Sequence, residues 1–296
     1  MLHIDYQECK ALIEDVIISS MEKDIGDNNY DFLHGVLGCG IYFLKKNNEN
    51  LIHRIIDFLF DTSISINDGN SICWKSRIDE KGKQGYNIAL SHGMTSIILF
   101  LSYVVEKGIM NQKIYKLLYG GINYILSQEI DVKKFGSFFP SQSLENGDVI
   151  SRSRLAWCYG DLGIAYSFWR AGKITSNEIL KKKSIEIFSY STKRVTMEST
   201  GIIDAQLCHG SAGVSMIFRR MYLETSYDIF SKATDFWIDK TLKYACFSDG
   251  LAGYKTYTHP KWHLDYSLLS GVSGIGLMLL SYLQNDCQSW DKMFLL

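Results

Sequence analysis

Two kinds of apolar segment alternate along the chain. In the first kind, apolar residues recur every three to four positions among charged ones, as in YQECKALIEDVIISSME from Tyr6, LIHRIIDFLF from Leu51, IYKLLYGGINYILSQE from Ile114 and TSNEILKKKSIEIFSYSTK from Thr175. This period predicts amphipathic helices with one face in solvent. In the second kind, apolar residues occupy nearly every position, which predicts helices buried on all sides. Outer and inner helices are therefore expected to alternate.

A glycine motif opens each segment of the second kind. The five segments are LHGVLGCGIYFL from Leu33, LSHGMTSIILFL from Leu90, WCYGDLGIAYSF from Trp157, LCHGSAGVSMIF from Leu207 and LSGVSGIGLMLL from Leu269. Their first glycines are roughly 50 to 67 residues apart, which leaves room for two helices of ordinary length and their loops. A repeated helix pair of this size predicts an all-α fold, an α/α toroid whose inner helices begin near one mouth.

Composition agrees with a folded helical protein and excludes several other classes. Of the 296 residues, 46% are hydrophobic and only two are proline, the residue that breaks helix interiors. The net charge of −1 argues against the basic surface that a nucleic-acid-binding protein needs. The longest apolar runs are about half the length of a membrane span, and the N-terminus lacks the apolar core of a signal peptide. We expect a cytoplasmic protein with no nucleic-acid partner and no membrane span.

Thiols and imidazoles gather at the starts of the predicted inner helices. Beside the first glycines of successive repeats stand His34, then His92, then Cys158 and Tyr159, then Cys208 and His209, and finally Ser270, with Asp31 one turn before His34. A helix N-terminus has unpaired N–H groups and a positive dipole end, which favour thiolates and developing anions. If equivalent positions meet at one rim, Cys158, Cys208 and His209 form a Cys2His set, the ligand type of a catalytic zinc with an open fourth position.

These residues also have purely structural interpretations. A cysteine at a helix start can be a small buried residue, and His92 can be a hydrogen-bonded core histidine. Asp31 can cap the helix that is entered near His34, and His34 itself is assigned to structure. Seven scattered cysteines without an export signal argue against disulfides. The cysteines expected to serve only in packing are Cys39, Cys246 and Cys287.

The motifs WCYGDLG, CHGSAG and SHGM, embedded in GxxG repeats, resemble those of the lanthionine synthetase C proteins. These proteins are the cyclases that close thioether rings in lanthipeptides. The similarity extends from YDFLHGVLGCGIYFL near the N-terminus to the closing WDKMFLL. It implies an α/α toroid, of seven helical layers in full-length members, with one zinc ion.

Particular site residues follow from this resemblance. It implies zinc ligands at Cys158, Cys208 and His209, a catalytic histidine at His92, and active-site positions for Asp31 and Tyr159. It further implies that a substrate cysteine takes the open zinc position and that its thiolate adds to a dehydroalanine or dehydrobutyrine of the same peptide. The resulting enolate is then protonated, and His92 either donates that proton or first accepts the thiol proton.

The chain departs from the family pattern in two ways. The second motif, HGMTS, has Ser96 in place of a glycine, which is a mild change at a helix start. The chain also begins late relative to full-length members, so one or two N-terminal helical hairpins are expected to be missing. We therefore predict a single domain over residues 1–296 with fewer layers than the seven-layer fold.

Three functions are compatible with these motifs. The leading one is a zinc-dependent lanthipeptide cyclase whose partners are a dehydrated precursor peptide and a lanthipeptide dehydratase. The same site could instead add a free thiol such as glutathione to dehydroamino acids, or an inactive toroid could bind a modified peptide. Polar segments such as AGYKTYTHPKWHLDYS from Ala252 precede inner helices, so they are expected at the mouth where a peptide would lie.

Overall fold

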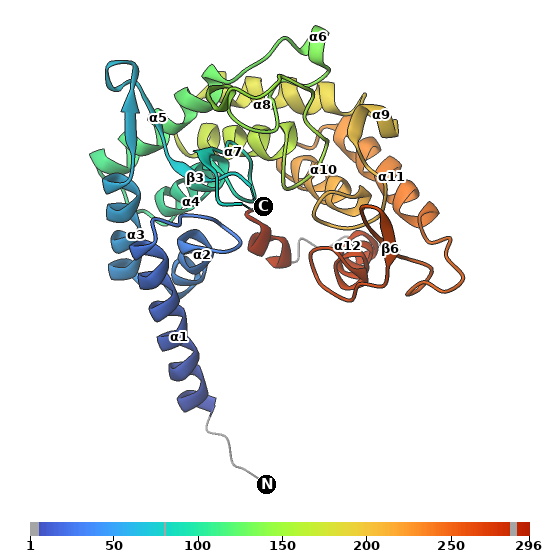
Figure 1. Cartoon of the computed structure of the whole chain (residues 1–296), viewed down its shortest axis with the longest axis horizontal. Coiled ribbons are helices and arrows are strands. Elements are labelled where there is room, and N and C mark those ends of the chain that lie inside the picture. The colour runs from blue at the N-terminus through green and yellow to red at the C-terminus, as the bar shows by residue number, and fades with distance from the viewer. Residues whose placement is uncertain (1–5, 80, 285–288) are drawn as a thin grey trace. The chain divides into compact units, whose positions relative to one another are not determined.

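The computed structural model of the chain describes residues 6–79, 81–284 and 289–296. The chain divides into two compact units, the first formed by residues up to 87 with 91–126, the second by 88–90 with 127–296. Helices make up most of both units (Figure 1). The expectation of a helical chain is confirmed, and the prediction of one domain stays a prediction.

Each of the five glycine motifs is followed at once by a helix. These helices are α2 (Val36–Lys46), α4 (Met94–Glu106), α7 (Asp161–Ile174), α10 (Ser211–Thr225) and α12 (Val272–Gln284). Each begins at the residue after the first glycine of its motif, as the pattern predicts. Most residues of α4, α7 and α10 are buried. Helix α12 differs from the expectation, because Leu280 and Leu283 on it are 46% and 79% exposed.

The segments predicted to be amphipathic form the other long helices. They are α1 (Tyr6–Gly26), α3 (Glu49–Asp61), α5 (Gln112–Ser127), α8 (Glu178–Ser191) and α11 (Asp228–Lys243). Within the first unit α3 packs on α2, and within the second α8 packs on α7 and α11 on α10. Asn48 and Asn177 cap α3 and α8 by accepting backbone N–H groups with their side-chain oxygens.

The connections contain short strands and turns that the helical pattern does not predict. Three antiparallel hairpins are formed by β1 (Ile64–Ile66) with β2 (Ser71–Cys73), β3 (Lys75–Arg77) with β4 (Gln84–Tyr86), and β5 (Thr256–Thr258) with β6 (Lys261–His263). The short helices are α6 (Val132–Phe135), α9 (Met197–Thr200), η1 (Asn67–Gly69), η2 (Leu144–Asn146) and η3 (Ser289–Phe294). Within the described ranges, no helix combines the length and the apolar character needed to cross a bilayer.

None of the cysteines that the structure describes takes part in a disulfide. Cys39 is half-buried beside α1, with its Sγ 3.8 Å from the carbonyl of Ile17. Cys246 is exposed, so the prediction that it packs in the interior is wrong. It lies in the segment that follows the end of α11 at Lys243. Cys287 lies outside the described residues.

Candidate metal and proton-transfer sites

Within the second unit, backbone hydrogen bonds join Leu90 to the turns that carry Cys158, Cys208 and Leu269. Leu90 donates its N–H to the carbonyl of Cys158 (3.1 Å), Cys158 donates to Cys208 (3.2 Å), and Cys208 donates to Leu269 (3.0 Å). Three of these four residues stand two positions before the first glycine of their motif. The hydrogen-bond series therefore places equivalent residues of successive repeats side by side. Two cysteines that are fifty positions apart in sequence become neighbours for this reason.

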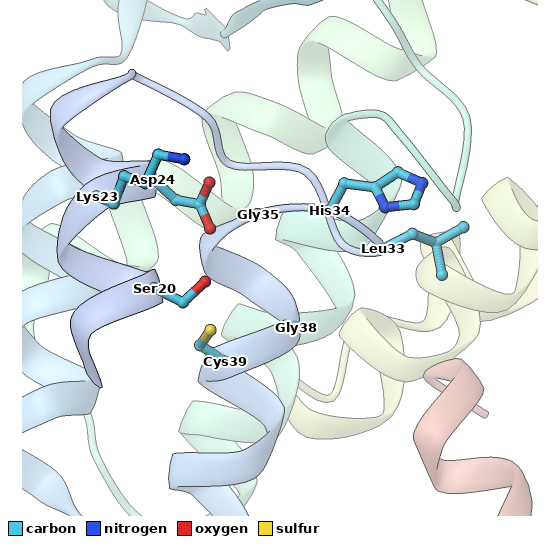
Figure 2. A pocket seen from close by; sticks show the side chains of 8 residues that line it. All are labelled: Ser20, Lys23, Asp24, Leu33, His34, Gly35, Gly38 and Cys39. Carbon is cyan, nitrogen blue, oxygen red and sulfur yellow. The ribbon is translucent and has the colours of Figure 1, made fainter. Parts of the chain in front are cut away.

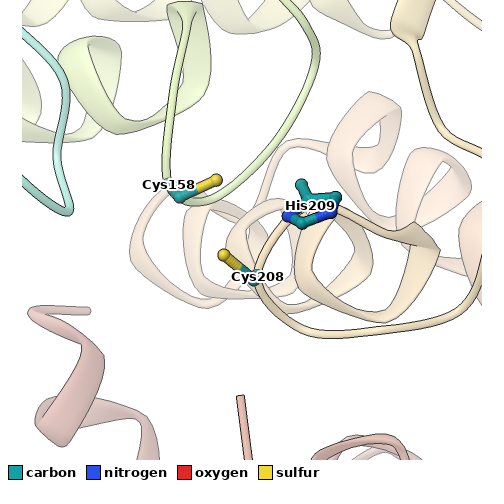
Figure 3. A group of neighbouring side chains, drawn as sticks. All are labelled: Cys158, Cys208 and His209. Atoms are coloured by element: carbon teal, nitrogen blue, oxygen red, sulfur yellow. The ribbon is translucent and has the colours of Figure 1, made fainter. Parts of the chain in front are cut away.

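Cys158, Cys208 and His209 form a cluster of potential metal ligands in the second unit (Figure 3). One ligand atom from each residue lies within 4.8 Å of the other two. Tetrahedral zinc with about 2.3 Å bonds to sulfur and about 2.0 Å to nitrogen needs ligand atoms about 3.5 to 3.8 Å apart. Small side-chain adjustments would bring the three atoms to that spacing. Cys158 is buried, whereas Cys208 and His209 are half-buried, so the cluster is partly exposed.

The two thiols of the cluster influence each other. A hydrogen bond with Cys208 and, secondly, burial raise the pKa of the Cys158 thiol well above its ordinary value. A divalent metal counters both effects because it binds thiolates and releases their protons. The donor set of two sulfurs and one imidazole nitrogen fits zinc and leaves one tetrahedral position for another ligand.

Two glycines allow the turns that carry the cysteines to pass close to other backbone atoms. Gly160, two residues after Cys158, has φ of 93°, and a Cβ there would lie 2.2 Å from the carbonyl oxygen of Arg154. A Cβ on Gly213 would lie 1.8 Å from the carbonyl oxygen of Leu207, the residue before Cys208. Any side chain at either position would displace the turn, which explains the GxxG pattern physically.

A buried ion pair holds the start of α7, directly after the Cys158 turn. Asp161 accepts the backbone N–H groups of Phe138 (3.1 Å) and Phe139 (3.0 Å) and pairs with the Arg194 guanidinium (3.2 Å). Burial raises the pKa of Asp161 to about 6, against the opposing effects of Arg194 and the two amides. Burial also lowers the pKa of Arg194.

Arg194 also connects this ion pair to the segment before the cysteine. Its guanidinium donates to the carbonyl of Ser153 and, at 2.9 Å, to the carbonyl of Ser199. Neither Asp161 nor Arg194 was predicted from the sequence as a residue of the site. Asp161 was visible as the residue that follows the glycine in WCYGD, whereas nothing near Arg194 in the sequence marks it.

The first unit brings Asp31 and His92 together. Asp31 Oδ2 lies 2.7 Å from His92 Nδ1, while Asp31 Oδ1 accepts the backbone N–H groups of Leu33 (2.7 Å) and His34 (2.8 Å). The carboxylate therefore caps a turn and contacts the imidazole at once, so the two interpretations of Asp31 are not exclusive. A carboxylate that accepts a hydrogen bond from the ring places a proton of His92 on Nδ1 and fixes the orientation of the imidazole.

His34 supports this arrangement in a way the sequence does not reveal. Its ring stacks on that of His92 with centroids 5.8 Å apart and planes 17° apart. His34 also lines a cavity of about 380 Å³ beside α1 and α2, together with Asp24 and Cys39 (Figure 2). Burial, and then the nearby Asp24, raise the pKa of Cys39, which keeps this thiol protonated and consistent with a packing role.

Tyr159 lies in the turn between Cys158 and Gly160 and is half-buried. Its position next to a potential ligand agrees with the location that the family resemblance implies, and its role stays a prediction. The structure thus places the sequence-predicted residues in two groups, one in each unit: Asp31 and His92 in the first, and Cys158, Tyr159, Cys208 and His209 in the second.

The fold and these two groups define a class of protein, an all-helical repeat protein with a Cys2His cluster at the starts of its inner helices. The model of the family described as lanthionine synthetase C-like protein matches residues 2–295. The chain belongs to this family.

Relatives agree with the family match. The chain is 26% identical over 227 residues to the nisin biosynthesis protein NisC of Lactococcus lactis subsp. lactis, a match that covers 70% of this chain and 53% of that protein. The chain thus spans about half the length of this curated relative. A solved structure of nisin cyclase is similar with a TM-score of 0.73 at 22% sequence identity, over 98% of this chain and 73% of that chain. This likeness shows the fold class, an α/α toroid.

Proposed function

We propose that this chain is a zinc-dependent lanthipeptide cyclase. It would form lanthionine and methyllanthionine rings by adding a peptide cysteine thiolate to dehydroalanine or dehydrobutyrine in the same peptide. The observation that carries the proposal is the convergence of Cys158, Cys208 and His209 within 4.8 Å. Such a donor set supports one zinc per chain with a position left for a substrate thiol. The relationship to NisC, a protein of nisin biosynthesis, supports the same reaction class.

The chain's own residues divide the work of this reaction. Zinc, when bound, lowers the pKa of a thiol ligand and so supplies a thiolate near neutral pH. Asp31 is proposed to accept the Nδ1 proton of His92 in a hydrogen bond that orients the ring, and His92 is proposed to exchange a proton with the substrate. The addition forms a C–S bond and an enolate, and His92 is proposed to return a proton to the α-carbon. Tyr159 is proposed to contact the substrate beside Cys158.

A dehydrated precursor peptide is the proposed substrate, and a lanthipeptide dehydratase that produces it is the proposed partner. Dehydration must precede cyclisation because the electrophile is the dehydroamino acid. This order of reactions requires a dehydrating enzyme that acts on the peptide before this chain does. Free thiols such as glutathione would compete with the peptide cysteine as the nucleophile. They can be added to the cyclisation assay described below.

Metal analysis of the purified full chain tests the metal centre. We expect about one zinc per chain, lost in Cys208→Ala and retained in Cys246→Ala, which removes an exposed cysteine outside the cluster. Zinc bound equally by both variants would contradict the proposed ligand set. A folded wild-type chain with no affinity for zinc would contradict the proposed function.

Cyclisation of a synthetic peptide with one cysteine and one dehydroalanine tests the proton-transfer group. His92→Ala should retain zinc and lose about 10²- to 10⁴-fold in kcat. Asp31→Asn should also slow the reaction, because the amide –NH2 would donate to Nδ1 and move the ring proton to Nε2. A wild-type rate in both variants would remove this pair from the mechanism. Preference for added glutathione over the peptide cysteine would favour thiol addition instead of ring closure.

A further inference from the structure

The β5–β6 hairpin of the second unit and the segment directly after it carry an exposed row of apolar side chains. Trp262, Leu264 and Tyr266 occupy every second position after the turn and are 38%, 45% and 67% exposed. Trp262 lies within β6, which ends at His263, and Leu264 and Tyr266 follow directly after the strand. Large apolar residues exposed close together mark an interaction surface more often than scattered ones do.

The side chain of Trp262 in this row is held in place by two neighbouring aromatic rings. The ring of Trp262 lies 4.9 Å from that of Phe247 and 5.1 Å from that of Tyr257, measured between centroids. Aromatic side chains fixed by such contacts lose little conformational entropy when a partner binds. The hairpin therefore presents a preformed surface.

The outer edge of β6 is open. Tyr257 lies opposite Trp262 and donates its N–H to Asp204 Oδ2 (2.9 Å), away from the hairpin. In antiparallel strands both residues of such a pair direct their N–H and C=O groups outward. The N–H and C=O of Trp262 therefore face the outer edge of β6, and among the described residues no third strand pairs with it. An edge of this kind can accept an added strand.

The hairpin is joined on two sides to the turn that carries the potential metal ligands. Asp204, which binds Tyr257, stands four residues before Cys208 in the chain. Thr256 Oγ1 donates to the carbonyl of Ser270 (2.7 Å), whose neighbour Leu269 accepts the N–H of Cys208 (3.0 Å). A chain bound along β6 would thus be attached to the same framework as the cysteine turn.

We propose that the edge of β6, with Trp262, Leu264 and Tyr266, is the docking surface for the substrate peptide. The peptide binds as an added extended strand and lays alternate apolar side chains on the row. This inference rests on the proposed function, because that function makes an unfolded peptide the substrate. Main-chain hydrogen bonds bind an extended peptide with little dependence on its sequence, and the connection through Asp204 links the bound strand to the turn of Cys208.

Binding of a labelled peptide to the zinc-loaded full chain tests this docking surface. The probe is a fluorescein-labelled peptide that contains dehydroalanine and apolar residues but no cysteine, so no ring can close. Trp262→Ala and Tyr266→Ser should each raise Kd about tenfold, as for aromatic anchors at interfaces. Ile179→Ser, which removes a 79% exposed apolar side chain on α8, should leave Kd unchanged.

A second pair of variants tests the strand edge itself. Leu264→Pro removes one backbone donor after β6 and should weaken binding more than Leu264→Ala, which keeps that N–H. Zinc content and melting temperature serve as controls for folding. Unchanged Kd in Trp262→Ala, Tyr266→Ser and Leu264→Pro would overturn the proposal. A dimer in solution that Trp262→Ala dissociates would overturn it in favour of a second copy of this chain.

The outcome for docking is separable from the outcome for catalysis. A wild-type chain that binds the cysteine-free probe through this surface but never closes a ring in a cysteine-containing peptide would refute the cyclase and support the docking surface. Ring closure with the same KM in wild type and Trp262→Ala would support the cyclase and refute the docking surface.

Discussion

Replacing Arg194 by methionine should destabilise the second unit strongly. The substitution removes the ion pair with Asp161 and two donations to backbone carbonyls, while leaving a carboxylate that is completely buried. Removing one partner of a buried pair costs about 3–5 kcal/mol, because the remaining charge has no compensation. We expect a loss of that size at pH 8, measured as the shift in the urea midpoint followed by circular dichroism.

The loss of stability in Arg194→Met should be larger at high pH than at low pH. The pKa of Asp161 in the folded chain, about 6, lies above its ordinary value of 3.8, so this group contributes most to stability when protonated. That contribution is complete below about pH 4 and is lost as the pH rises through 6. Arg194 lowers the pKa of Asp161, so in Arg194→Met the loss extends to higher pH. The variant should be closest to wild type near pH 5.

The double variant Asp161→Asn with Arg194→Met provides the control. Neutralising the carboxylate removes the uncompensated charge, so the double variant should be more stable at pH 8 than Arg194→Met alone. It should also lack the change in stability between pH 5 and 8 that Arg194→Met shows. A loss below about 1 kcal/mol in Arg194→Met at pH 8, or the same loss at pH 5, would refute the reasoning from a buried charge pair.

Three further changes test how the cysteine turns are held. Gly213→Ala should place a Cβ 1.8 Å from the carbonyl oxygen of Leu207 and so lower both stability and zinc content; a melting temperature equal to wild type would show that the backbone relaxes freely. Trp157→Phe should lose the 2.9 Å donation from Nε1 to the carbonyl of Phe294 and cost about 1–3 kcal/mol in urea unfolding, and a neutral result would show that this bond is replaced by water. Cys208→Ser should keep the fold yet weaken zinc binding as measured by chelator competition, since a hydroxyl is a poorer zinc ligand than a thiolate; an unchanged affinity would place the metal elsewhere.

Much of the helical framework can be predicted from sequence. The glycine motifs mark where α2, α4, α7, α10 and α12 begin, because a residue without Cβ is needed where the turn passes close to another backbone segment. The apolar pattern likewise predicts that α4, α7 and α10 are mostly buried, since burial depends on the periodicity of side chains along a helix, but it fails for α12, whose Leu280 and Leu283 are exposed. The hairpins were not predictable, because strands of three residues are too short to show a periodic pattern.

The sequence alone determined which residues are chemically suited to a metal centre and that they occupy equivalent repeat positions. Only the tertiary structure decided that Cys158 and Cys208 are neighbours, because hydrogen bonds between turns of successive repeats bring them together. Tertiary structure also decided that Asp31 contacts His92 while capping its own turn, and that Arg194 pairs with Asp161. Contacts between residues 33 to 61 positions apart depend on how whole helices pack, and local sequence patterns carry no information about that packing.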